Sequence, residues 1–231
     1  MYSQSGRKNC IKICNGDIIM KNLKEYIVTE NNFFKNLGIG IKVQIEKWLQ
    51  KHNVENFTIN DDDLTIDVNG KVDLSFYEKD ELPEFIQFRK VNGDFTLYYS
   101  TMLLSLKGCP KEVDGEFTCT NCKKLKSLEG CPQKVGKDFN CNVCNNLKSL
   151  EGCPKEIGES FYCDDCRNLK SLKGGPQIVG KDFDCGYCKN LKSLEGCPKE
   201  VGRSFYCDNC GKQFTQDDVK KVSSVKGTIN V

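Results

Sequence analysis

Phenylalanine, cysteine, leucine and proline recur along this chain with a fixed 22-residue period. One unit reads F-x-C-x-x-C-x-x-L-K-S-L-E-G-C-P-x-x-V-G-x-x. The phenylalanines stand at Phe95, Phe117, Phe139, Phe161, Phe183 and Phe205, and the first cysteines at Cys119, Cys141, Cys163, Cys185 and Cys207. A fixed period of this length indicates stacked repeats, because no single unit can bury its own apolar side chains.

The local pattern inside one unit predicts a parallel sheet. F-x-C alternates with a period of two, which is typical of a half-buried strand. Parallel strands need a crossover of a dozen or more residues, and one unit is long enough to supply a short strand and that crossover. The return arm E-G-C-P-K-E-V-G holds a proline and two glycines, so we expect a loop or one short turn there. The fold class is a β-rich solenoid with one short strand per repeat.

The cysteines first suggest zinc. The two C-x2-C pairs between Cys119 and Cys144 have the spacing of a structural zinc site. One repeat earlier, however, Leu97 and Ser100 occupy the positions of such a pair, and Gly175 replaces a cysteine of the Gly-Cys-Pro series. Leucine cannot ligate zinc, but it can replace a buried cysteine. We therefore expect structural cysteines, no metal and no cofactor, with a zinc-binding structural module as the alternative.

The unit resembles the leucine-rich repeat in its cysteine-containing form. Phe139-x-Cys141-x-x-Cys144-x-x-Leu147-x-x-Leu150 is similar to that family's L-x-L-x-x-C/N-x-x-L-x-x-L. The resemblance covers about residues 91–210, with phenylalanine in place of the first strand leucine. Strings such as L-K-S-L-E-G-C-P-K-E-V-G also resemble repeat proteins of phage, prophage and bacterial genomes. Leucine-rich repeats usually bind proteins on their concave sheet face, so the resemblance implies a protein-binding scaffold.

The segments outside the repeat are expected to close its ends. We divide the chain into a small α+β cap (1–63), a degenerate first repeat (64–90), six repeats (91–210) and a C-terminal cap (211–231). The N-terminal piece either only caps the solenoid or carries a contact surface of its own.

Within the N-terminal piece, apolar spacing predicts a helix at Ile41–His52 and a second at Ile19–Ile27, and the residues between Cys10 and Cys14 suggest a strand. Leu64–Leu74 fits either a hairpin around Asn69-Gly70 or a first repeat. The repeat is favoured because Val72 precedes Phe95 by one period and one further position.

The C-terminal piece contains a capping signal. Thr215 with Asp218 three residues later predicts the N-terminus of a short helix that runs through Val222. A final strand is expected near Gly227–Val231.

Residues that alternate with the buried strand positions should point outward and form the binding face. No lysine or arginine stands among them, tyrosines and aspartates gather toward the C-terminal half, and such a face should attract a basic protein. The simpler alternative is that these residues only hydrate an exposed sheet. The candidate partner-binding residues are Tyr98, Tyr99, Asn140, Asn142, Tyr162, Asp164, Asp165, Asp184, Tyr187, Tyr206, Asp208 and Asn209.

A row of lysines recurs at the L-K-S-L position, at Lys126, Lys148, Lys170 and Lys192. Such a row could follow a phosphate backbone. Neighbouring glutamates weaken its field, so we expect a solvated edge and treat nucleic-acid binding as an alternative.

No catalytic constellation is visible in the sequence. His52 is the single histidine, and nucleophile-elbow, phosphate-loop, dinucleotide and zinc-protease motifs do not occur. The formal net charge of +2 gives no whole-chain attraction to nucleic acid or membrane. The first residues lack a signal-peptide core, and no apolar run approaches the ~20 residues of a membrane span.

Together these features predict a non-catalytic protein-binding module that is cytoplasmic and monomeric when free. The resemblance adds a sharper hypothesis, an anti-CRISPR-type inhibitor that occupies the basic nucleic-acid groove of a host defence protein.

Overall fold

The computed structural model describes residues 10–13, 16–19, 38 and 40–231. The chain forms two compact units, residues 1–46 and 47–231. In the first unit, β1 (Cys10–Ile13) and β2 (Gly16–Ile19) form an antiparallel pair, so the expected strand after Cys10 is present. Ile19 ends β2, and the rest of the helix predicted at Ile19–Ile27 lies outside the described residues.

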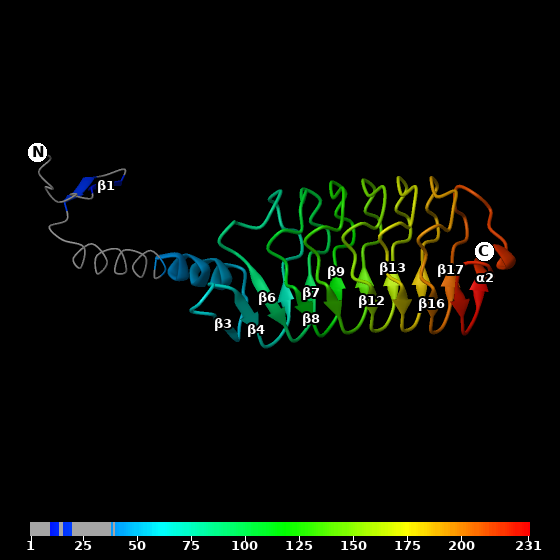
Figure 1. Ribbon diagram of the computed structural model, residues 1–231, viewed down its shortest axis with the longest axis horizontal. Helices are drawn as coiled ribbons and strands as arrows, with labels where there is room; N and C mark the ends of the chain where they lie inside the picture. Colours follow the sequence, from blue (N-terminus) through cyan, green and yellow to red (C-terminus); the bar gives the residue numbers. More distant parts are fainter. Residues whose placement is uncertain (1–9, 14–15, 20–37, 39) are drawn as a thin grey trace, which may run out of the picture. The chain divides into compact units, whose positions relative to one another are not determined.

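The second unit contains a solenoid whose turns add strands to two sheets (Figure 1). Within the described residues, the nine-stranded Glu-Val sheet consists of β3 (Phe57–Ile59), β4 (Ile66–Val68), β6 (Phe88–Val91), β8 (Glu112–Val113), β10 (Lys134–Val135), β12 (Glu156–Ile157), β14 (Ile178–Val179), β16 (Glu200–Val201) and β18 (Ser224–Val225). The eight-stranded Phe sheet consists of β5 (Val72–Asp73), β7 (Phe95–Thr96), β9 (Phe117–Thr118), β11 (Phe139–Asn140), β13 (Phe161–Tyr162), β15 (Phe183–Asp184), β17 (Phe205–Tyr206) and β19 (Ile229–Asn230). Only β3 and β4 pair antiparallel in these two sheets, and every other pairing is parallel.

The predicted solenoid is confirmed, including its register. Phe139 pairs with Phe117 on one side and with Phe161 on the other, as the 22-residue step requires. The structure adds a second short strand to each turn, at the Glu-Val pair of the arm that the sequence assigns to a loop or short turn. The reason is that backbone groups of successive arms bond to one another, for example the N–H of Gly136 to the carbonyl of Val113 at 2.9 Å.

Residues 64–90 build a turn of the solenoid rather than a hairpin. β4 pairs in parallel with β6, and β5 pairs in parallel with β7. The register places Val72 opposite Phe95, so the first turn is one position longer than the regular repeat.

A column of phenylalanine rings fills the core beneath the Phe sheet. Phe95, Phe117, Phe139, Phe161, Phe183 and Phe205 are fully buried. Neighbouring ring centroids from Phe95 to Phe205 lie 5.0 to 5.9 Å apart. Full burial of such a side chain contributes about 1.5–3 kcal/mol, so this column is a main source of stability.

The two cysteine rows have different roles. In the first row the thiols of Cys141 and Cys185 reach carbonyls of the following turn at 3.4 and 3.5 Å, and Leu97, which has no donor, fills the same row one turn before Cys119. Thiols of the second row donate hydrogen bonds to carbonyls of the preceding turn, as Cys144 does to Cys119 at 3.2 Å. Ser100 replaces a second-row cysteine and donates in the same way to Leu74. The second row is therefore a polar ladder and not only a filling of small apolar side chains.

Glycine is required at two positions in each return arm: at the second, a Cβ on Gly158 would lie 2.0 Å from the carbonyl oxygen of Gly136, and at the first the backbone is also left-handed. Gly152 has a φ of 94°, and a Cβ there would lie 2.4 Å from the backbone nitrogen of Glu129. Gly108, Gly130, Gly174 and Gly196 repeat this positive φ. Because only glycine fits this combination, the E-G-C-P string closes each turn.

The C-terminal cap follows the sequence signal. Thr215 caps α2 (Gln216–Lys220) and forms a capping box with Asp218. The helix ends at Lys220, before the predicted Val222, because the chain turns to form β18. The expected final strand is present as β19.

Residues 40–51 are helical, close to the predicted Ile41–His52. Within the described part of the chain, no helix combines the length and apolar character needed to cross a membrane.

Candidate interaction surface

The candidate residues lie on the outward face of the Phe sheet, in three rows that run along the stack. The first row follows each phenylalanine and contains Thr96, Thr118, Asn140, Tyr162, Asp184 and Tyr206. The second row follows the first cysteine and contains Tyr98, Thr120, Asn142, Asp164, Gly186 and Asp208. The third row comes next and contains Phe76, Tyr99, Asn121, Val143, Asp165, Tyr187 and Asn209.

The third row has left-handed backbone throughout. Its φ values run from 51° at Asp165 to 62° at Asn121. The fold imposes this conformation, because each of these residues from Phe76 to Tyr187 donates its N–H to a carbonyl of the next turn, as Val143 does to Asp164 at 3.0 Å. Asparagine and aspartate tolerate it, whereas aromatic and β-branched residues are strained there. Phe76, Tyr99, Val143 and Tyr187 occupy the row in spite of this strain.

The N-terminal end of the face is aromatic. Phe76, Tyr98 and Tyr99 are 64%, 41% and 43% exposed. Their ring centroids lie 4.5 Å apart for the two tyrosines, and 6.3 and 5.9 Å from the ring of Phe76. The three rings form one exposed patch, which we call the aromatic cluster. The sequence prediction included both tyrosines but missed Phe76, although Phe76 and Tyr99 are separated along the chain by the same interval as Val72 and Phe95.

The C-terminal end of the face is acidic. A Cβ placed on Gly186 would lie 3.2 Å from Oδ1 of Asp184 and 3.1 Å from Oδ1 of Asp208, so these two carboxylates converge above the glycine. The backbone N–H of Gly186 donates to Asp184 at 2.8 Å. Asp164, Asp184 and Asp208 form what we call the acidic cluster.

Burial and mutual repulsion disturb the charges of the acidic cluster. Burial raises the pKa of Asp184 to about 6, and the negative charges of Asp164, Asp208 and Asp182 add to this rise. Burial also raises the pKa of Asp164, with smaller contributions from Asp165 and Asp208. A cation that approaches carboxylates held together in this way stabilises them, because it reduces their mutual repulsion.

The middle of the face is tied together by its own polar groups. Oδ1 of Asn140 accepts hydrogen bonds from the hydroxyl of Thr120 at 2.6 Å and from the N–H of Asn142 at 3.1 Å. Oδ1 of Asn142 accepts from the N–H of Asp164 at 3.0 Å. Asn140 and Asn142 thus hold neighbouring strands in register, and their carbonyl oxygens are engaged within the face.

The remaining candidates lie at the border of the face. Asp165 forms an ion pair with Arg167 at 2.9 Å, and Nζ of Lys189 lies 5.6 Å from the ring centroid of Tyr187. Tyr162 and Tyr206 are half-buried in the first row, on either side of Asp184 along the stack. Cations therefore touch the edge of the face, while its three rows contain none.

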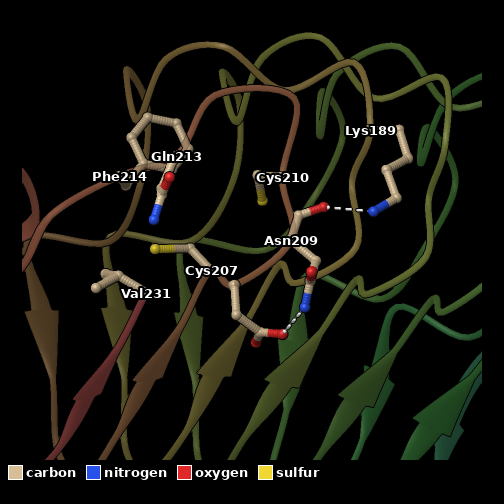
Figure 2. Close-up of a pocket in the computed structure, with 8 residues that line it drawn as sticks. Lys189, Cys207, Asn209, Cys210, Gln213, Phe214 and Val231 are labelled. Atoms are coloured by element: carbon tan, nitrogen blue, oxygen red, sulfur yellow. Dashed lines mark hydrogen bonds between the residues drawn. The ribbon is translucent and has the colours of Figure 1, made fainter.

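A hollow of about 390 Å³ extends the acidic end at the last turn (Figure 2). Asp208 and Asn209 line it together with Cys207, Cys210 and Phe214. Its polar groups bond to one another, since Nδ2 of Asn209 donates to Asp208 at 2.7 Å and Lys189 donates to the carbonyl of Asn209 at 3.0 Å. Among the described residues, no group of three or more histidine, cysteine, aspartate or glutamate side chains has a geometry that could hold a metal ion.

The thiols are protonated at neutral pH in nearly all of the ladder. Burial raises the pKa values of Cys163 and Cys166 well above the ordinary thiol range. The pKa of Cys210 shifts in the other direction, because a side-chain hydrogen bond with Cys185 lowers it. Buried neutral thiols are poor nucleophiles and poor metal ligands.

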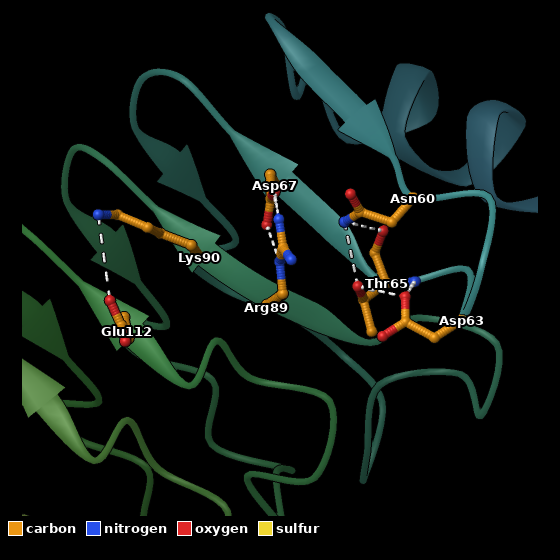
Figure 3. A network of polar contacts seen from close by, with 7 residues as sticks. All are labelled: Asn60, Asp63, Thr65, Asp67, Arg89, Lys90 and Glu112. Atoms are coloured by element: carbon orange, nitrogen blue, oxygen red, sulfur yellow. Dashed lines mark hydrogen bonds and ion pairs between the residues drawn. The ribbon is translucent and has the colours of Figure 1, made fainter.

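The Glu-Val sheet differs from the Phe sheet because its charges neutralise one another. Arg89 forms a paired hydrogen bond with Asp67, and Nζ of Lys90 lies 4.0 Å from Glu112 (Figure 3). Nζ of Lys90 also lies 3.0 Å from Asp114. Such ion pairs leave little charge for a partner.

The lysine row is exposed on successive turns. Lys126, Lys148, Lys170 and Lys192 all reach solvent. Glu151 lies 4.0 Å from Lys173 rather than within ion-pair distance of Lys148.

Comparison of the chain with protein-family models, with curated proteins and with solved structures finds no match. The solenoid is supported by the 22-residue repeat and by the strand register.

Proposed function

We propose that this chain is a non-catalytic protein-binding module whose Phe-sheet face binds the basic surface of another protein. The observation that carries the proposal is the acidic cluster, in which Asp184 and Asp208 converge above Gly186 on a face whose rows hold no lysine or arginine. Tyr162 and Tyr206 border this cluster, and tyrosine is a frequent binding hot spot.

The energetics favour a cationic partner. The carboxylate of Asp184 is poorly solvated and is repelled by its neighbours, so an incoming cation replaces lost hydration and removes repulsion. Attraction between opposite charges also speeds association. The stacked strands hold the aspartates in place before binding, which lowers the entropic cost of forming the complex.

The absence of catalysis is part of the proposal and is supported by the position of His52. Its ring stacks on Trp48 with centroids 4.0 Å apart, and its Nδ1 lies 2.8 Å from the carbonyl oxygen of Trp48. The histidine thus contributes to packing at the N-terminal end of the stack. We also propose that the protein works as a monomer in the reducing cytoplasm, where the free thiols of its ladder are stable.

A finer proposal concerns the partner. A protein that binds nucleic acid in a basic groove would suit the acidic face, and the resemblance to phage repeat proteins favours a host defence protein. An anti-CRISPR-type inhibitor of this kind should block DNA cleavage by a purified CRISPR effector complex. Unchanged cleavage across a panel of such complexes would remove this finer proposal and leave the protein-binding module intact.

The experiment that tests the proposed function is affinity capture from a bacterial lysate under reducing conditions. Wild type is compared with Tyr162→Ala/Asp164→Lys/Tyr206→Ala/Asp208→Lys and with a control variant, Lys126→Gln/Lys148→Gln/Lys170→Gln/Lys192→Gln. We expect one protein to be retained by wild type and by the lysine control, and lost by the face variant. Equal retention by all three would place the contact elsewhere and contradict the proposal.

Nucleic-acid binding is the second candidate, favoured by the four exposed lysines on successive turns, about 4.8 Å apart. It requires binding of duplex DNA or RNA that falls steeply with salt and is lost in the lysine variant. Binding that persists in the lysine variant would reject this candidate.

A further inference from the structure

We propose that the aromatic cluster is an arginine-binding site, so that the Phe-sheet face takes arginine-bearing protein segments in preference to lysine-bearing ones. This inference rests on the proposed function, since it names the side chain that the basic partner presents.

The three rings of the aromatic cluster are exposed and lie next to one another. Phe76, Tyr98 and Tyr99 lie on adjacent turns with centroid distances of 4.5 to 6.3 Å, and no described side chain covers them enough to bury them. A contiguous patch of exposed aromatic side chains is unusual on a free surface and often marks a contact site.

Two of the three aromatic residues have a left-handed backbone. Phe76 and Tyr99 have φ values of 60° and 57°, in a row where asparagine is accepted at Asn121 and Asn209. Asparagine or glycine would be less strained at both positions. Strain that is kept at an exposed position points to a use for the side chain rather than to folding.

Within the described part of the chain, the rings of the aromatic cluster have no cation of their own. Among the described residues, no lysine or arginine lies over these three rings, whereas Lys189 lies over Tyr187 in the same row and Lys212 lies over Phe214. The outward rows therefore already show one tyrosine with a cation at its face, whereas no cation of the described residues lies over the rings of the aromatic cluster. In the hollow beside Phe76, Lys51 and Lys79 are balanced by Asp73 and Glu78, so no excess of positive charge there repels a cation.

Arginine fits this site better than lysine for two reasons. Its planar guanidinium stacks on aromatic faces, and it is less strongly hydrated than an ammonium group. The acidic cluster lies on the same face, three strand spacings from β7 to β13, or about 14 Å away. An extended segment of about four to five residues spans that distance, so one partner segment with several arginines reaches both clusters.

The test uses two labelled synthetic peptides of about nine residues, in which glycine alternates with either arginine or lysine, so that length and charge are equal. Affinities are measured by fluorescence anisotropy. We expect wild type to bind the arginine peptide about two- to fivefold more tightly. Phe76→Ser/Tyr98→Ser/Tyr99→Ser should bind both peptides equally. The acidic-cluster variant Asp164→Asn/Asp184→Asn/Asp208→Asn should bind both more weakly but keep the preference for arginine.

A second aromatic variant, Phe76→Leu/Tyr98→Leu, keeps apolar area and removes two π faces, so it guards against a folding defect in the serine variant. Equal binding of the two peptides by wild type, weakened by the acidic-cluster variant, would overturn the arginine site and leave the proposed function standing. A preference that survives in both aromatic variants would assign the selectivity to the carboxylates and overturn the inference. Failure of both peptides to bind wild type would overturn the inference and the proposed function together.

Discussion

The thiol of Cys166 donates a hydrogen bond to the backbone carbonyl oxygen of Cys141, 3.2 Å away and one turn earlier in the stack. Cys122, Cys144, Cys188 and Cys210 repeat this bond at 3.2 to 3.4 Å. The second-row position therefore requires a small donor, so serine replaces cysteine at Ser100, whereas leucine, which has no donor, replaces a first-row cysteine at Leu97.

This difference between the rows predicts that serine is favoured over alanine more strongly in the second row than in the first. Cys166→Ser should be more stable than Cys166→Ala by about 1 kcal/mol, because the hydroxyl keeps a buried hydrogen bond. At Cys163 the advantage of serine over alanine should be smaller than at Cys166, because leucine without a donor fills this row at Leu97 and its thiols bond only at 3.4 to 3.5 Å, at Cys141 and Cys185. Urea unfolding of the four variants measures both differences. An equal advantage of serine over alanine at both positions would contradict the assignment of the second row as the main donor ladder.

The raised pKa of Asp184 predicts a pH-dependent loss of stability. Its pKa rises on folding from an ordinary value of 3.8 to about 6, so between these values the native state binds more protons than the unfolded state. Stability from this group is therefore fully present below about pH 4 and is lost as the pH rises through 6. After allowance for partial exposure, we expect Asp184→Asn to stabilise the protein by about 1–2 kcal/mol at pH 7.5 and to change little at pH 4.

Denaturant unfolding of wild type and Asp184→Asn at the two pH values isolates the contribution of the Asp184 carboxylate to the free energy of unfolding. Asp67 and Asp182, whose pKa values are lowered by Arg89 and Arg203, contribute in the opposite sense at low pH and are common to both proteins. A gain that is equal at pH 4 and pH 7.5 would mean that the carboxylate charge is not the cause.

The left-handed third row predicts a stabilising substitution. Val143 has a φ of 60°, which is costly for a β-branched residue. Val143→Asn should raise the free energy of unfolding by about 1 kcal/mol, since asparagine already occupies this row at Asn121. Asp165→Asn is the matched control and should be nearly neutral, because aspartate already tolerates the conformation and the exposed ion pair with Arg167 that it removes contributes little. Thermal unfolding that ranks the control above Val143→Asn would refute the strain argument.

The same row predicts a conflict between stability and binding at Tyr99. Tyr99→Asn should stabilise the fold for the same reason as Val143→Asn, yet weaken binding of the arginine peptide. Anisotropy and thermal unfolding of one protein sample give both quantities. Weakened stability would show that the tyrosine ring supports the fold.

The cysteine ladder predicts that chelators do not change the thermal stability of the protein. The thiols are buried and neutral, so removal of zinc with EDTA under reducing conditions should leave the melting temperature unchanged. Metal analysis of the reduced protein gives the ratio of zinc to protein, and one zinc per chain would restore the zinc alternative.

The solenoid could be predicted because its determinants are local and repeated. The 22-residue step fixes which residues pair, as Phe117 and Phe139 do, and the leucine at Leu97 argues against zinc from its place in the repeat alone. The Glu-Val strands could not be predicted, because two residues carry no visible alternation and their pairing depends on the neighbouring turns.

The surface was predicted less completely than the fold. Position in the repeat places Tyr98, Asp184 and Asp208 on one face, but only the structure shows that the two carboxylates converge above Gly186. It also shows that Asn140 and Asn142 hold adjacent strands together, a role that their sequence positions do not reveal. Phe76 was missed because the first turn departs from the repeat by one position.

The most direct test of the central claim is a titration of the arginine-glycine peptide against the acidic-cluster variant Asp164→Asn/Asp184→Asn/Asp208→Asn. The matched control is Asp62→Asn/Asp114→Asn/Asp217→Asn, which makes the same charge change at exposed positions away from the Phe-sheet face. Each lost charge interaction should cost up to about 0.5 kcal/mol of binding free energy. We therefore expect roughly tenfold weaker binding for the acidic-cluster variant and a change of less than about twofold for the control. Equal weakening in the two variants would show that the peptide responds to net charge alone, and it would contradict a binding site on this face.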